Sequence, residues 1–347
     1  MPQITVGQSR VFGIDSVPVP TPMIHELDPR SPGTVEGLLP VLRQAVAADL
    51  PLHPEPDAGY LGVLTASNPT RERRVFAVRD AEGAIVSFAR LQRDLTANRT
   101  LAFGTLWTAL AHRDTPTESA LLEHLKTVAT EAGCNRLVLD DPANDRNAAL
   151  HLRHGARVVG SDKRSMLDLK TLDREQFAKW AAPSPANDGY RFEYWTEPTP
   201  DHLAEAMAVA HDAMNDAPRG DLEIEHTPVD VEQQQAAERF AATLGIRGHV
   251  VAALTPDSEI AGYSNVYAFP GVMPMASVGA TAVVSAHRGR GLGLRLKAAL
   301  TLRVLDLEPH LTSFETWNNE DNEPMLRVNR LLGYELADVW SGFQYDL

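Results

Sequence analysis

The sequence predicts an α+β fold with a mixed sheet, built twice along a chain of 347 residues. Three observations lead to this prediction. The length is comfortable for two domains, a set of expected elements recurs at a nearly constant offset, and a segment rich in structure breakers separates the two occurrences. A hydrophobic fraction of 44% and a charged fraction of 22% are typical of domains that bury their own cores.

The repeat is clearest in two hairpins, at residues 75–88 and 250–263. In each, apolar and β-branched runs flank a short polar turn, which is the pattern of antiparallel strands. Two further matches keep nearly the same offset of 175 positions: Ala111-His112-Arg113 with Ala286-His287-Arg288, and Asn144 with Asn322. Matches that recur in the same order indicate a duplicated domain.

The boundary between the halves is expected where prolines and a glycine interrupt regular structure, at residues 179–189. Residues 1–178 then form the first domain, which begins with an arm of about twenty residues that contains several prolines. Residues 190–347 form the second domain. We expect each half to run through a helical beginning, a hairpin, a strand, a helix, a strand and a further helix.

The elements of the second half can be placed individually. A strand is expected at 278–284, and a helix then starts after the glycine-rich turn at Leu292 and stops before Pro309. The next strand covers 311–317. Asn322 can cap the following helix, because its side-chain oxygen can accept a hydrogen bond from the first turn, and Gly333 is suited to end that helix.

Composition limits the partners. A net charge of −14 argues against nucleic acid, whose phosphates need a basic face, and would instead attract small cations such as amines. No stretch approaches the roughly 18 to 20 apolar residues of a membrane helix, and the first ten residues do not resemble a signal peptide. The single cysteine, Cys134, fits a reducing cytoplasm, where we expect a monomer or a homodimer. His151 and His154 have no evident third ligand, so no metal site is expected.

The main chemical motif is Arg288-Gly289-Arg290-Gly291-Leu292-Gly293, between an expected strand and an expected helix. A helix N-terminus presents unpaired N–H groups and partial positive charge to phosphate oxygens, and glycines let a pyrophosphate approach the backbone. The two arginines can add charge and bidentate hydrogen bonds. Leu294 stands where a dinucleotide-binding turn needs its third glycine, and no Gly-Lys-Ser/Thr follows, so neither of those phosphate sites fits.

Residues 282–293 resemble the acetyl-CoA motif of the GNAT N-acetyltransferase superfamily, Gln/Arg-x-x-Gly-x-Gly/Ala after a strand. Downstream, residues 316–334 look like the second cofactor motif of that family, in the right order and spacing. The resemblance covers 190–347 well and extends faintly to 23–169. It implies two tandem GNAT-like domains, each a mixed, mostly antiparallel sheet flanked by helices.

The resemblance also implies which residues hold acetyl-CoA as co-substrate. The backbone groups of two strand residues would pair with the pantetheine arm, the loop would hold the pyrophosphate, and two asparagines beyond the next strand would bond the arm or the thioester. These residues are Val283, Val284, Arg288, Gly289, Arg290, Gly291, Leu292, Gly293, Asn318 and Asn322. Turn and cap chemistry explains Asn322 equally well.

The first half departs from the pattern. Opposite the phosphate loop it has Arg113-Asp114-Thr115-Pro116-Thr117-Glu118, without glycine, with a proline that lacks an N–H, and with two carboxylates that would repel a pyrophosphate. We therefore expect a degenerate GNAT half that does not bind acetyl-CoA in this manner and that has a structural role.

The resemblance leaves the acid and the base open. The family often has a tyrosine general acid where this chain has Asn329, and a carboxylate early in the strand before the loop, where 275–279 has none. Three replacement candidates are Glu223, Glu315 and Tyr334.

Each candidate has another interpretation. Glu223 belongs to a polar segment that could be a solvated loop and that also contains Asp216, Asp221, Glu225 and His226. Strand alternation could send Glu315 to solvent, and packing is the commoner role for a tyrosine such as Tyr334.

The sequence thus predicts an N-acetyltransferase that moves an acetyl group from acetyl-CoA to the primary amine of a small molecule. Because Cys134 lies in the degenerate half, direct attack in a ternary complex is favoured over an acylated enzyme. Two alternatives stay open: a non-catalytic acetyl-CoA-binding regulatory protein, and a mycothiol-synthase-like acyltransferase that acts on an amino-sugar conjugate.

Overall fold

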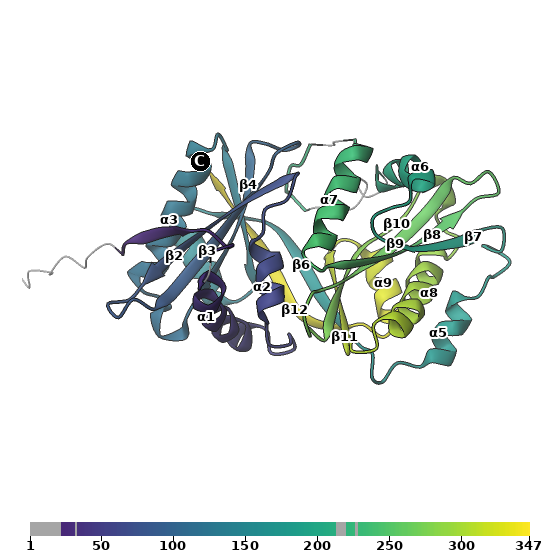
Figure 1. Ribbon diagram of the computed structural model, residues 1–347, viewed down its shortest axis with the longest axis horizontal. Coiled ribbons are helices and arrows are strands. Elements are labelled where there is room, and N and C mark those ends of the chain that lie inside the picture. The colour runs from purple at the N-terminus through teal and green to yellow at the C-terminus, as the bar shows by residue number, and fades with distance from the viewer. Residues whose placement is uncertain (1–21, 32, 213–219, 226–227) are drawn as a thin grey trace, which may run out of the picture.

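The computed structural model describes residues 22–31, 33–212, 220–225 and 228–347 (Figure 1). The expected N-terminal arm lies outside the described residues. Among the described residues, no helix is both long enough and apolar enough to cross a membrane.

Among the described residues, the first half contains the expected hairpin, four further strands and four helices. Its elements are β1 (Ile24–Leu27), α1 (Thr34–Asp49), α2 (Ala58–Thr65), β2 (Arg71–Arg79), β3 (Ile85–Asp94), β4 (Leu101–Thr108), a 3-10 turn (Leu110–His112), α3 (Pro116–Glu131), β5 (Arg136–Pro142), α4 (Asp145–Arg153) and β6 (Arg157–Asp168). The hairpin expected at 75–88 is β2–β3, which turns at Gly83 with φ 88°.

A helix, α5 (Arg174–Ala181), spans residue 178, the expected end of the first domain, and has no counterpart in the first half. The second half then repeats the order of the first with β7 (Arg191–Thr196), α6 (Asp201–His211), α7 (Val231–Thr243), β8 (Arg247–Leu254), β9 (Ile260–Ala268), β10 (Met275–Val283), a 3-10 turn (Ser285–His287), α8 (Leu292–Leu307), β11 (Ser313–Asn319), α9 (Glu323–Leu331) and β12 (Glu335–Asp346). The Asn322 side chain accepts a hydrogen bond from the Met325 N–H, as expected for the N-cap of α9. Gly333, which was expected to end this helix, follows it with φ 86°.

The twelve strands of the described residues form one sheet, in the order β1-β2-β3-β4-β5-β12-β6-β11-β10-β9-β8-β7. Neighbours are antiparallel except for two parallel pairs, β4 with β5 and β10 with β11. The expected α+β class, with a mixed, mostly antiparallel sheet flanked by helices and built from two tandem halves, is confirmed. Figure 1 shows α1 to α3 around one half, α5 to α9 around the other, and β6 and β12 between them.

The two halves exchange their last strands. β12, from the second half, pairs with β5 of the first, and β6, from the first half, pairs with β11 of the second. On β12, the Tyr345 hydroxyl lies 2.6 Å from Nδ1 of His151, whose Nε2 lies 2.7 Å from the Asp141 carboxylate. Because His151 is fully buried, this bond ties β12 to the first half. Each half therefore depends on the other for a complete sheet.

Both faces of the second half are covered. On one face, α5 and α8 bury a core that includes Phe177, Leu296 and Val304. On the opposite face, α6 packs Leu203 and Met207 against β8 and β9. Helix α8 is anchored in this core, so its N-terminus stands in a fixed position at the end of β10.

Candidate functional site

The site begins where two parallel strands separate. β10 pairs with β11 from Met275–Ser313 to Val278–Thr316, and beyond these residues the pairing stops although both strands continue. β10 also carries a bulge between Val278 and Thr281 in its pairing with β9. A bulge bends its strand and disrupts the ladder locally. The strands therefore open a gap that leads toward the N-terminus of α8.

The glycine-rich loop closes the outer end of this gap. Gly289 and Gly291 have φ angles of 76° and 75°, in the left-handed region that other residues rarely adopt, and Gly291 is the N-cap residue of α8. The Arg288 side chain donates from Nε to the Val283 carbonyl over 2.9 Å. The Asn187 amide donates to the Arg290 carbonyl over 2.9 Å. The loop is thus held by the strand before it and by the connection between the halves.

A cavity of about 660 Å³ fills the space between the loop, the separated strands and α9. Eight of the expected cofactor residues line it: Val283, Arg288, Gly289, Gly291, Leu292, Gly293, Asn318 and Asn322. Val284 and Arg290 are not among the lining residues. The Val284 N–H donates to the Ala261 carbonyl on β9, so the sheet already uses the group that was expected to meet pantetheine.

The glycines of the loop leave open space in front of its backbone. A Cβ built at Gly289 or at Gly293 would have no heavy atom within 4 Å, and one at Gly291 would meet only the Asn187 amide at 3.6 Å. The space in front of these backbone atoms is therefore not filled by the protein. Together with the exposed N–H groups of a helix N-terminus, it suits a phosphate group.

Three hydrogen-bonded polar side chains, Asn318, Asn329 and Lys297, lie beside the cavity, and Asn318 and Lys297 line it. Asn329 donates from its amide to the Asn318 carbonyl oxygen over 2.6 Å, and the Lys297 ammonium donates to the Asn329 carbonyl oxygen over 2.6 Å. Lys297 lines the cavity and is only 3% exposed. Burial lowers the pKa of its ammonium to about 7. Sequence reasoning missed Lys297, and the available signal was a lysine within the apolar run 296–300 of α8.

Tyr334 lies behind Lys297. The lysine ammonium is 4.7 Å from the centre of the Tyr334 ring. The Tyr334 hydroxyl is buried and has no hydrogen-bond partner within the described part of the chain. Burial raises the pKa of this hydroxyl. Tyr334 therefore packs against the ammonium and does not line the cavity.

Glu315 is buried away from the cavity. Its carboxylate accepts a hydrogen bond from Arg164 on β6 over 3.2 Å, and Arg164 also contacts Asp338 on β12. Burial raises the pKa of the Glu315 carboxyl, whereas Arg164 lowers it. Solvent exposure, the alternative expected from strand alternation, is not observed, because Glu315 is 6% exposed. The arrangement is that of an ion-pair network across the exchanged strands.

Glu223 lies against the first half. Its carbonyl accepts a hydrogen bond from Arg136, at the start of β5, over 2.9 Å, and its side chain is 92% exposed. Two neighbours dock on the same half, because the Asp221 N–H donates to Val159 and the Glu225 N–H donates to Asn98. The structure therefore does not bring Glu223 to the cavity. Asp216 and His226 lie outside the described residues.

A second polar network, also missed from the sequence, lies behind the inner end of β10. Tyr267 donates to the Glu197 carboxylate over 3.2 Å, and Asn265 accepts a hydrogen bond from the Ala280 N–H over 2.6 Å. A Cβ at Gly279, which lines the cavity, would lie 2.5 Å from the Asn265 side chain and 2.7 Å from the Tyr267 ring. Burial, together with the neighbouring charge of Glu238, raises the pKa of the Glu197 carboxyl to about 7. A carboxyl of this kind can accept a proton near neutral pH.

The first half has the same strand opening, but side chains fill it. β4 and β5 pair only from Leu101–Arg136 to Gly104–Leu139. The space beyond, lined by Thr108, Glu118 and Asp141 among others, is about 20 Å³. This is room for about one water molecule.

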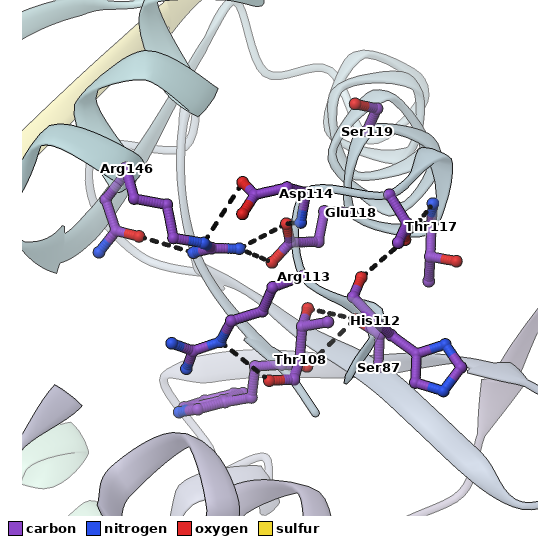
Figure 2. Close-up of polar contacts among 12 residues, drawn as sticks. Ser87, Thr108, His112, Arg113, Asp114, Thr117, Glu118, Ser119 and Arg146 are labelled. Carbon is purple, nitrogen blue, oxygen red and sulfur yellow. Dashed lines mark hydrogen bonds and ion pairs between the residues drawn. The ribbon is translucent and has the colours of Figure 1, made fainter. Parts of the chain in front are cut away.

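Figure 2 shows what closes the counterpart of the phosphate loop. Arg146 on α4 points at the loop and pairs with the carboxylates of Glu118 and Asp114. The Glu118 carboxylate also accepts the Asp114 N–H over 2.7 Å. Arg113 does not take part in these contacts. Its guanidinium donates two hydrogen bonds to the Asp49 carboxylate, over 2.9 and 2.6 Å. An internal carboxylate therefore occupies the helix N-terminus of the first half.

The structure of the chain is similar to solved GNAT structures. A tandem GNAT protein from the clavulanic acid biosynthesis pathway matches with a TM-score of 0.75 and 25% identity, over 93% of this chain and 98% of that one. A GCN5-related N-acetyltransferase from Sphaerobacter thermophilus matches with a TM-score of 0.66 and 15% identity, over 93% and 95%. A glucosamine N-acetyltransferase region of a fungal β-N-acetylglucosaminidase matches with a TM-score of 0.64 and 12% identity, over 96% of this chain and 39% of that one. No protein-family model and no curated protein sequence matches the chain.

Proposed function

We propose that this chain, which has the tandem GNAT fold, is an N-acetyltransferase that moves an acetyl group from acetyl-CoA to the primary amine of a small molecule. The observation that carries the proposal is the contrast between the halves. The second half keeps a cavity of about 660 Å³ at a glycine-built helix N-terminus, whereas the same place in the first half is reduced to about 20 Å³. Acetyl-CoA then binds the second half alone.

The residues of the cavity fit acetyl-CoA in three places. The open backbone at Gly289, Gly291 and Gly293 suits the pyrophosphate. The gap between β10 and β11 suits an extended arm that pairs with strand backbone. Asn318, whose side-chain oxygen accepts a hydrogen bond from Asn329, lines the cavity on the β11 side of that gap, where its amide can bond the arm or the thioester. The arrangement binds and orients the thioester, which is the larger part of what such a transfer needs.

The transfer takes place by direct attack of the amine in a ternary complex. Cys134, the only cysteine, is buried in the core of the first half, where burial raises the pKa of its thiol. It therefore cannot carry the acyl group at the cavity. Glu197 is the carboxylate that we assign to the amine proton. It does not itself line the cavity, but it accepts a hydrogen bond from Tyr267, whose ring lies next to Gly279 in the cavity wall, so the proton reaches Glu197 by relay.

The test is thiol release from acetyl-CoA with a panel of primary amines. The panel includes aliphatic amines and an amino sugar, since one of the similar structures is described as a glucosamine N-acetyltransferase region. We expect at least one amine to accelerate thiol release. The variant Gly291→Val, which places a β-branched residue at φ 75°, should abolish the release together with acetyl-CoA binding.

One observation favours a second function. The family tyrosine is replaced by Asn329, whose amide is already used by Asn318 and Lys297. A chain that kept its cofactor pocket without an acid would be a non-catalytic acetyl-CoA-binding regulatory protein. Acetyl-CoA binding without turnover of any amine would support that alternative.

A further inference from the structure

We propose that Lys297 is the general acid of the transfer and donates a proton to the thiolate that leaves acetyl-CoA. The inference rests on the proposed function. It assigns a role to a residue whose type is unusual at this place: a lysine that is buried on α8 and lines the cavity.

The position of Lys297 along α8 suits the role. It lies six positions after Gly291 at the helix N-terminus, which is about 9 Å along the axis at about 1.5 Å per residue. The loop end of the cavity takes the phosphates, so Lys297 stands deeper in a cavity that is also lined by Gly279 and Thr316, next to the point where β10 and β11 separate. A pantetheine arm that follows the gap between β10 and β11 places its thioester near Lys297.

The bonding of the ammonium leaves a proton to give. A lysine ammonium has three N–H donors. One of them is bound to the Asn329 carbonyl oxygen at 2.6 Å, and the ring of Tyr334 lies 4.7 Å away on another side. Asn329 is itself fixed by Asn318, so this bond orients the lysine. The other two N–H donors have no hydrogen-bond partner among the described residues, so they remain available to a group bound in the cavity that Lys297 lines.

The surroundings tune this ammonium for proton transfer. The groups that contact it, Asn329 from α9 and Tyr334, carry no charge, because burial raises the pKa of the Tyr334 hydroxyl. At the loop end of the same cavity stand His287 and Arg288. Burial alone lowers the pKa of Lys297 to about 7, so protonated and neutral forms interconvert near neutral pH.

The step balances with two groups of this chain. The amine nitrogen forms a bond to the carbonyl carbon and loses one proton, to Glu197 as proposed above. The carbon–sulfur bond breaks, its electron pair goes to sulfur, and sulfur takes one proton from Lys297. The products are an amide and a free thiol, with Glu197 protonated and Lys297 neutral. One proton passes through solvent from Glu197 to Lys297 to restore the starting state.

The experiment measures thiol release from acetyl-CoA as a function of pH, for wild type, Lys297→Met and Lys297→Arg. The acceptor is the best amine of the panel, or water where no amine is turned over. Because the protonated lysine acts, wild-type kcat should fall as pH rises through the pKa of Lys297. In Lys297→Met, this fall of kcat with pH should disappear and kcat should be about 10²- to 10⁴-fold lower, with little change in acetyl-CoA affinity. Lys297→Arg should not restore kcat, since a guanidinium keeps its charge but releases no proton.

A matched control comes from the next turn of α8. Thr301 is buried to the same extent, bonds the Lys297 carbonyl and does not line the cavity, so Thr301→Val should keep kcat and its pH dependence. A Lys297→Met enzyme with wild-type kcat and an unchanged pH limb would overturn the inference. So would full recovery in Lys297→Arg, because charge alone would then suffice, or a wild type that binds acetyl-CoA and releases no thiol. Failure to bind acetyl-CoA at all would instead refute the proposed function.

Discussion

Replacement of Gly293 by alanine should raise stability and weaken acetyl-CoA binding. Gly293 is the second residue of α8, and a Cβ there would have no heavy atom within 4 Å. Alanine therefore fits without strain, and the gain in helix propensity stabilises the fold by up to about 1 kcal/mol. The same methyl group projects into the cavity that Gly293 lines.

The expected loss of affinity follows from the phosphate contact. A hydrogen bond from a backbone N–H to a charged phosphate contributes about 1.5 to 3 kcal/mol. A methyl group that keeps the phosphate from the N–H removes one such bond, which weakens Kd roughly 10- to 150-fold. Calorimetric titration measures the affinity, and thermal or urea unfolding measures the stability of the same preparation.

The control is Thr117→Ala, at the second position of α3 in the closed counterpart site. It should leave the acetyl-CoA affinity unchanged, because Arg146 and Glu118 already fill that helix N-terminus (Figure 2). A Gly293→Ala protein that is more stable and binds acetyl-CoA with unchanged affinity would refute the assignment of the loop to the pyrophosphate.

Three further predictions concern the supports of the site. Asn187→Ala removes the 2.9 Å bond to the Arg290 carbonyl and should weaken acetyl-CoA binding by several-fold in the same titration, with the fold retained. Arg146→Met leaves the buried Glu118 carboxylate unpaired and should lower the free energy of unfolding by about 3 to 5 kcal/mol without a change in acetyl-CoA affinity; an unaltered unfolding curve would contradict the structural role of this ion pair. Glu197→Gln should be more stable than wild type above pH 7, because the wild type loses stability as pH rises from the usual carboxyl pKa of 4.5 to the folded value of about 7. In urea unfolding, this advantage should vanish at pH 4. An equal difference in stability at both pH values would count against the raised pKa.

Local features of the fold could be predicted from the sequence because they depend on short segments. The two hairpins follow from apolar runs around a polar turn, and α9 begins at the Asn322 cap and ends before Gly333 as expected. The phosphate loop could be predicted for the same reason, since its positive φ angles require glycine at 289 and 291.

The strand exchange could not be predicted from the repeat. β6 and β12 are equivalent by sequence order, so either could have closed its own half, and the choice depends on contacts such as that between His151 and Tyr345, which are 194 positions apart. Glu315 illustrates the consequence. It was a catalytic candidate because of its strand position, and its contact with Arg164 exists only because β6 lies beside β11.

Lys297 could not be assigned for a different reason. Helical periodicity places residue 297 among the core positions of α8, and nothing local indicates that a cavity opens beside it. Only the structure shows that the Asn329 carbonyl oxygen accepts a hydrogen bond from this lysine. The two residues lie on different helices and are 32 positions apart, so no short segment of the sequence could indicate the contact.

The most direct test of the central claim is the stoichiometry of acetyl-CoA binding to the wild-type chain, measured by calorimetric titration. The open cavity beside Gly291 and the carboxylate-filled counterpart beside Glu118 predict one site per chain. Two sites per chain, or none, would contradict it.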